Sequence, residues 1–126
     1  MTRILLVEDN EMNRDIMLRK LISEGYEVTI AVDGEEAISK GHSDEPNLIL
    51  MDLGLPKIDG WEATRRLKAG VETSQIPVIA LSGYAMQEDR EKALAAGCDD
   101  FCAKPVDFKR LQGMMKALLQ PVPVPR

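Results

Sequence analysis

Five short segments that read as strands, several of them continuously apolar, alternate with five segments of helical pattern along the chain. The strand segments cover residues 4–7, 27–31, 47–51, 77–81 and 100–103, and the helical segments cover residues 11–23, 35–40, 61–68, 86–96 and 108–119. Continuous apolar runs of strand length are typical of strands that are buried on both faces of a parallel sheet. The alternation therefore predicts the α/β class: a doubly wound, five-stranded parallel sheet with helices on both faces.

The preference for right-handed crossovers leaves few ways to order these strands, and the flavodoxin-like order 2-1-3-4-5 is the natural choice. In this order the first and third strands are neighbours. The length of 126 residues suits a single hydrophobic core, so we expect one domain over residues 1–119. Residues 120–126 alternate Pro and Val, cannot continue a helix, and are expected to form an extended tail.

Several polar residues mark the expected helix ends. Asp9 or Asn10 can cap the helix that begins at residue 11, because either side chain accepts a hydrogen bond from a free backbone N–H. Asp107 is expected to cap the last helix. The inner face of that helix carries Leu111, Met114, Met115 and Leu118.

Composition excludes several classes of function. The net charge of −5 argues against a nucleic-acid binder, and no apolar run approaches the length of a membrane span. There is no signal-peptide pattern at the N-terminus. Cys98 and Cys102 have neither redox nor zinc spacing, so we expect buried thiols in a reducing compartment, the cytoplasm. The single histidine, His42, is expected on the surface of a helix.

Acidic residues follow the first and third predicted strands. Glu8 and Asp9 come directly after the first, and Asp52 comes directly after the third. Because the carboxyl ends of neighbouring parallel strands meet at one edge, we expect three carboxylates to converge there. They repel one another unless a cation lies among them, and an all-oxygen set of this kind suits Mg²⁺.

Two more polar residues follow the remaining strands at the same edge: Ser82 after the fourth strand and Lys104 after the fifth. An ionised carboxylate can attack phosphorus without a general base and form an acyl phosphate, so Asp52 is the candidate nucleophile. Phosphoryl transfer needs mainly positioning and neutralised oxygens, which a metal, a lysine and a hydroxyl supply. Each residue alone has a plainer interpretation, such as a helix cap or a turn, but five at one edge favour a site.

The chain resembles the receiver domains of two-component response regulators, of the stand-alone single-domain type, from about Arg3 to Leu119. The matching segments are Leu6-Val7-Glu8-Asp9-Asn10, Met51-Asp52-Leu53-Gly54-Leu55-Pro56, Asp59-Gly60, Ala80-Leu81-Ser82-Gly83, Ala96-Gly97 and Lys104-Pro105. The resemblance implies a signalling phosphoacceptor and not an enzyme. It implies that Asp52 accepts a phosphoryl group from a phosphohistidine on a histidine kinase or histidine phosphotransfer protein.

The resemblance also implies roles for the other site residues. Asp9 and Asp52 would ligate Mg²⁺ directly, Glu8 through water, and Gly54 through its backbone carbonyl. The phosphoryl oxygens would be bound by Ser82 and Lys104, and the peptide bond between Lys104 and Pro105 is expected to be cis.

A conformational switch is implied as well. On phosphorylation the Ser82 hydroxyl would move toward the new oxygens, and Phe101 would turn into the vacated space. The added charge would then alter the face made by the last two helices and the strand between them, where a downstream protein target would bind. Tyr84, two residues after Ser82, is expected to shield the acyl phosphate partly from water.

The helix that follows the first strand is the expected docking surface for the kinase or phosphotransfer protein, and Asn13 and Arg14 are expected to be exposed on it. Nothing after Leu119 could form an effector domain. We therefore expect the protein to signal by binding another protein or by passing its phosphoryl group on. The same sequence could also be a domain of a larger chain.

Three alternative functions remain. A nucleotide or flavin domain would need a glycine- and hydroxyl-rich loop after the first strand, where this chain has acidic residues. A haloacid-dehalogenase-type phosphatase would need a second aspartate two residues after Asp52, where this chain has Gly54. A receiver-type module that binds partners without phosphorylation would keep the site as a relic. Labelling of Asp52 by acetyl phosphate and Mg²⁺ separates this third alternative from the phosphoacceptor.

Overall fold

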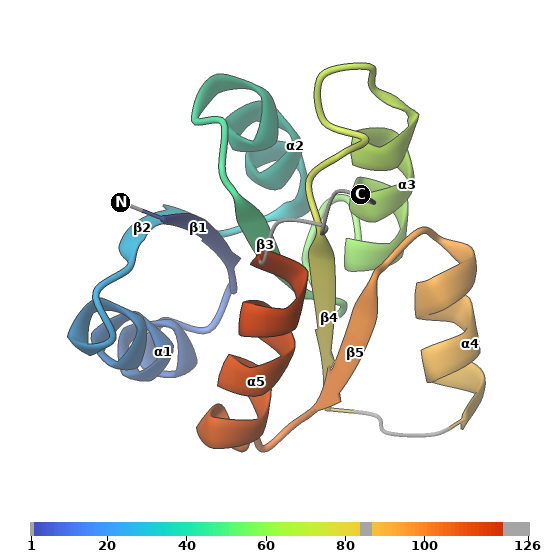
Figure 1. The fold of residues 1–126 in the computed structure, drawn as a ribbon. Helices are drawn as coiled ribbons and strands as arrows, with labels where there is room; N and C mark the ends of the chain where they lie inside the picture. The colour runs from blue at the N-terminus through green and yellow to red at the C-terminus, as the bar shows by residue number, and fades with distance from the viewer. Residues whose placement is uncertain (1, 84–86, 120–126) are drawn as a thin grey trace, which may run out of the picture.

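The computed structural model describes residues 2–83 and 87–119, and strands and helices alternate throughout this part of the chain (Figure 1). Their bounds are β1 (Arg3–Val7), α1 (Glu11–Ser23), β2 (Glu27–Ala31), α2 (Gly34–Ser43), β3 (Leu48–Asp52), α3 (Gly60–Ala69), β4 (Val78–Ser82), α4 (Gln87–Ala95), β5 (Asp100–Ala103) and α5 (Phe108–Leu119). The predictions for Tyr84, for a helix start at Met86 and for the tail 120–126 lie outside the described residues.

The five strands form one sheet in the order β2-β1-β3-β4-β5, and every neighbouring pair is parallel. The predicted fold class and strand order are therefore confirmed. The register pairs Val7 with Met51 and Asp52 with Leu81, so β1, β3 and β4 end at nearly the same level. Side chains at these ends consequently share one edge of the sheet.

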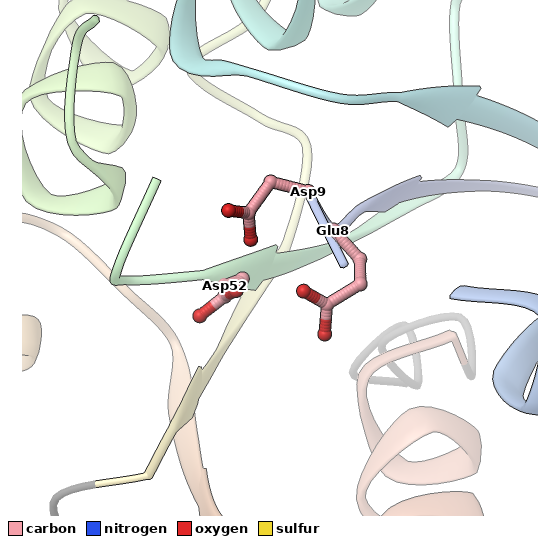
Figure 2. A group of neighbouring side chains, drawn as sticks. All are labelled: Glu8, Asp9 and Asp52. Carbon is pink, nitrogen blue, oxygen red and sulfur yellow. The ribbon is translucent and has the colours of Figure 1, made fainter. Parts of the chain in front are cut away.

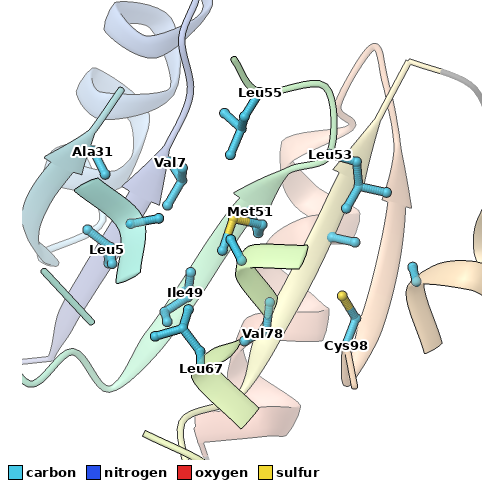
Figure 3. Packing of buried hydrophobic residues seen from close by; sticks show 14 of the residues in the cluster. Leu5, Val7, Ala31, Ile49, Met51, Leu53, Leu55, Leu67, Val78 and Cys98 are labelled. Atoms are coloured by element: carbon cyan, nitrogen blue, oxygen red, sulfur yellow. The ribbon is translucent and has the colours of Figure 1, made fainter. Parts of the chain in front are cut away.

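Helices α1 and α5 cover one face of the sheet, and α2, α3 and α4 cover the other (Figure 1). The α2–α3–α4 face buries an apolar cluster made mainly of small and branched residues, much of which is drawn in Figure 3. Its members are Leu5, Val7, Ala31, Ala37, Ile49, Met51, Leu53, Leu55, Ala63, Leu67, Val78, Ala80, Ala93, Cys98 and Phe101. Alternate residues of each strand enter the two clusters, as the pleat of a strand requires.

The α1–α5 face buries the second cluster. Leu111 and Met115 of α5 are buried in it, and Met114 and Leu118 pack against it, which confirms the predicted inner face. On α1, Met17 and Leu21 are buried, whereas Met12 is 73% exposed and Ile16 is 49% exposed. Helix α1 therefore presents apolar side chains to solvent close to the carboxyl edge of the sheet.

Polar side chains define where the helices begin. The Asn10 side chain accepts a hydrogen bond from Asn13 N at 3.0 Å, so Asn10 is the cap of α1 and Asp9 is not. Asp33 and Asp59 accept in the same way at the starts of α2 and α3. Because Asn10 takes the capping role, the carboxylate of Asp9 is available for another ligand.

Helix α2 continues to Ser43, three residues past the predicted end at about Lys40. Gly41 explains the continuation, since a Cβ built there would lie 2.6 Å from Cδ2 of Leu67 on α3. The glycine lets the two helices approach closely, and this tertiary contact outweighs the low helix propensity of glycine. Strands β3 and β4 include Asp52 and Ser82, so these residues are the last of their strands and do not follow them.

The two cysteines are free and buried, as predicted, and they belong to the clusters on opposite faces of the sheet. Cys98 Sγ lies 3.7 Å from Oγ1 of Thr64, within the range of a weak hydrogen bond. His42 is exposed on α2, also as predicted. In the part of the chain that the structure describes, no helix has the length and apolar character needed to cross a membrane.

Burial raises the pKa of the Cys98 thiol to about 11. We therefore expect native Cys98 to resist iodoacetamide at pH 8, because the reactive thiolate is scarce and inaccessible. Because the pKa of Cys98 in the folded protein lies above the ordinary value of 9.0, the protonated thiol favours the folded state. This contribution to stability is complete below pH 9 and is lost as the pH rises through about 11. Peptide-resolved alkylation in buffer and in denaturant measures the difference. Rapid labelling of the native protein at pH 8 would contradict the expectation.

Candidate functional site

Three carboxylates meet at the carboxyl edge of the sheet (Figure 2). Glu8 and Asp9 follow β1, and Asp52 ends the neighbouring strand β3. One oxygen from each lies within 4.8 Å of the others. Glu8 and Asp52 are only 4% and 6% exposed, whereas Asp9 is exposed. The parallel pairing of two neighbouring strands thus brings together residues that are more than 40 positions apart.

The cluster is electrostatically costly. Burial raises the pKa of Glu8, and the hydrogen bond and charge of Asp52 raise it further, while Lys104 opposes the rise. A carboxylate that loses water needs a compensating positive charge. The donor set is all oxygen, it is partly buried and it remains open to solvent at Asp9. These properties fit a hard divalent cation such as Mg²⁺.

Lys104, in the loop between β5 and α5, supplies positive charge to the cluster. Its Nζ lies 3.0 Å from Glu8 Oε1 and 3.3 Å from Asp52 Oδ2. Its backbone N–H donates to Ser82 O at 2.7 Å, which ties it to the end of β4. Its peptide bond with Pro105 is cis, as expected. Burial alone would lower the pKa of Lys104, but the hydrogen bond to Glu8 and the two carboxylate charges outweigh burial and raise the pKa. The side chain is therefore an ammonium at neutral pH.

The remaining predicted residues lie on the same or neighbouring strands. Ser82 is the last residue of β4 and is 3% exposed. The Gly54 N–H donates to Asp52 Oδ1 at 3.1 Å, which orients the carboxylate. Phe101 lies in β5, 6% exposed, in the apolar cluster under α2–α4. The fold thus brings Glu8, Asp9, Asp52, Ser82 and Lys104 to one edge.

Arg14 is a site residue that sequence reasoning missed. It was expected to be exposed, but it is half-buried, and its Nη1 donates to the backbone carbonyls of Glu8 at 3.2 Å and Asp9 at 3.4 Å. Its guanidinium therefore holds the loop that carries two of the three acids. The only available signal was its position one helical turn after the Asn10 cap, which places it beside that loop.

Comparison with known proteins decides the family. The sequence model of the protein family described as the response regulator receiver domain matches residues 4–116. The chain belongs to this family. A receiver domain of this kind takes part in two-component signalling and is a signalling phosphoacceptor, not a classical enzyme. The Glu8–Asp9–Asp52 cluster described above is typical of such a phosphoacceptor site.

Individual relatives agree. This receiver domain is 36% identical over 116 residues to the polar-differentiation response regulator DivK of Brucella ovis, covering 92% of this chain and 94% of that protein. Among solved structures it resembles the receiver domain of the sensor histidine kinase PA1611 from Pseudomonas aeruginosa, with a TM-score of 0.88, 40% identity and coverage of 94% and 97%. That structure has a magnesium ion coordinated in its active-site cleft. A CheY-like receiver from Methanospirillum hungatei has a TM-score of 0.87, 33% identity and 94% coverage of both chains.

Proposed function

We propose that Asp52 accepts a phosphoryl group from a phosphohistidine on a histidine kinase or a histidine phosphotransfer protein. The observation that supports this most strongly is the convergence of Glu8, Asp9 and Lys104 around a single carboxylate at the end of a central strand. Among these acids, Asp52 is the one on β3, and it accepts a hydrogen bond from the following loop. A nearby ammonium and nearby metal ligands are the two features that phosphoryl transfer requires.

The proposed step is an in-line displacement at phosphorus. An oxygen of ionised Asp52 attacks phosphorus, the P–N bond to the partner's imidazole breaks, and the electron pair stays on the imidazole nitrogen. No proton has to leave Asp52, so no general base is needed. Lys104 Nζ lies close enough to Asp52 to bind an oxygen of the transferred group, and Ser82 on the next strand would donate to another.

The residues proposed to hold Mg²⁺ are Asp9 and Asp52 directly, Glu8 through water, and Gly54 through its carbonyl. The cation supplies charge neutralisation for the phosphoryl oxygens when it is bound. The support is the all-oxygen cluster of this chain and the magnesium ion in the PA1611 receiver domain. We further propose that phosphorylation acts through Ser82 and Phe101 on the α4–β5–α5 face, which a downstream protein target binds.

Acetyl phosphate tests this function directly. Incubation of the purified protein with acetyl phosphate and Mg²⁺ should add one phosphoryl mass, and peptide mapping should place it on Asp52. Chelation of Mg²⁺ should prevent the gain. A protein that gains no mass under these conditions would instead be a receiver-type module that binds partners without phosphorylation.

The exposed side of α1 should govern transfer from the protein partner. Met12 and Ile16 are exposed there, and Ile16 lines a cavity of about 470 Å³ that also contacts Lys104, Pro105 and Phe108. We expect Ile16→Ala to slow transfer from a phosphorylated partner about tenfold, because it removes an apolar contact without adding a charge near Lys104. The rate with acetyl phosphate should stay unchanged.

Arg14 is not a suitable probe of docking, since it also holds the Glu8–Asp9 loop. Asn13, which is exposed, is the better second position. Time courses of phosphoryl transfer, measured with the protein donor and with acetyl phosphate, give the ratio of the two rates for each variant. Equal slowing with acetyl phosphate and with the protein donor would argue against docking on α1.

A further inference from the structure

The start of α2 packs directly against the loop that joins β3 to α3. A Cβ built on Gly34 would lie 1.9 Å from the backbone oxygen of Ile58 and 2.7 Å from its carbonyl carbon. No side chain fits between these two backbones, so α2 rests on the loop at this point. Figure 1 shows α2 and α3 side by side on the same face of the sheet, with this loop below them.

Lys57 adds a second link at the same place. Its Nζ lies 3.5 Å from Oδ2 of Asp33, the N-cap of α2, and 3.9 Å from Oε2 of Glu35, in the first turn of that helix. The backbone of Lys57 has φ +66°, in the left-handed region that favours glycine. A glycine would adopt this turn without strain, but it would lose both ion pairs.

The base of the same loop is attached to the phosphoacceptor. Gly60 N donates to Leu53 O at 3.1 Å, and a Cβ on Gly60 would lie 2.4 Å from the backbone oxygen of Asp52. Gly54, the proposed carbonyl ligand, lies between this base and the outer turn at Lys57, and its N–H is bound to Asp52. The loop is therefore fixed at its base by packing and at its outer turn by α2.

We propose that Lys57 is a positioning residue for the metal site: by tying the outer turn of the loop to Asp33 and Glu35, it restricts the motion of Gly54 beside Asp52. This inference rests on the proposed function, because Gly54 matters only if its carbonyl faces a cation. Exposed ion pairs contribute little to global stability, so the effect should appear in the order of the loop and not in the unfolding of the domain.

Lys57→Gly separates these two effects. Removal of the left-handed strain should leave the variant at least as stable as the parent in denaturant unfolding. Loss of the tether should make hydrogen exchange of the Gly54 amide about tenfold faster in the absence of metal. It should also weaken Mg²⁺ binding about three- to tenfold, as measured by the change of amide chemical shifts during a Mg²⁺ titration. Lys57→Arg should keep both values at those of the parent, and Lys57→Gln, which removes the charge but keeps most of the side chain, should match the glycine variant in exchange rate and Mg²⁺ affinity.

Glu45→Gly is the matched control. Glu45 also has a left-handed backbone, with φ +48°, but it lies between α2 and β3, away from the metal site. Its replacement should relieve the same strain and change neither Gly54 exchange nor Mg²⁺ affinity. If Lys57→Gly matches Glu45→Gly in both readouts, Lys57 is only a turn residue. If the parent neither binds Mg²⁺ nor labels Asp52, the proposed function fails, whereas the exchange rates of Gly54 still decide whether Lys57 orders the loop.

Discussion

Asp52→Asn is expected to abolish labelling by acetyl phosphate, with a loss of about a thousandfold or more. The amide is neutral and its oxygen is a poor nucleophile at phosphorus. The neighbouring acids and Lys104 remain in place, but the side chain that they surround can no longer accept the phosphoryl group. The shape of the side chain is retained, and Gly54 N–H can still donate to the amide oxygen. Time-resolved intact-mass spectrometry in the presence of Mg²⁺ measures the loss.

Glu72→Gln is the control for this variant. Glu72 is an exposed carboxylate whose Oε2 lies 3.8 Å from His42 Nδ1, beside a cavity lined by Gly41, Glu45 and Pro46 at the opposite edge of the sheet. Its removal changes the net charge by the same amount and should leave labelling unchanged. Labelling of Asp52→Asn at the rate of the parent would show that another residue is the acceptor.

Gly60→Ala should cause a large loss of stability for the addition of a single methyl group. The added Cβ would lie 2.4 Å from Asp52 O and 2.7 Å from Leu53 Cα, and both are backbone atoms that cannot move alone. Overpacking of this kind costs about 3 kcal/mol. The nearest of these atoms belongs to the acceptor residue itself, so acetyl phosphate labelling should fall as well. Urea unfolding measures the first effect.

Gly113→Ala is the opposite case. Gly113 is exposed inside α5, and a Cβ there meets nothing within 4 Å. Alanine has the higher helix propensity, so this variant should gain about 0.5–1 kcal/mol. The two alanine substitutions add the same methyl group with opposite expected signs. If both shift the urea midpoint in the same direction, the close packing of Gly60 on the acceptor strand does not control stability.

The amino-acid order by itself determined the sheet, its strand order and the list of residues at its edge. Apolar runs such as 48–51 report burial directly, because a strand buried on both faces has few polar positions. Asp52 stood out for the same reason, as a lone charge at the end of such a run. The segments around Asp9, Ser82 and Lys104 then identified the family.

Tertiary structure alone decided which polar side chain does what. From the sequence, either Asp9 or Asn10 could cap α1, and in the structure the Asn10 side chain accepts the capping hydrogen bond. The hydrogen bonds of Arg14 and the ion pairs of Lys57 carry no periodic signal. They depend on where flexible side chains reach across loops that are distant in sequence, as when Lys57 meets Asp33. Local pattern encodes burial, whereas pairing between loops is fixed only when the packed strands and helices set the distances.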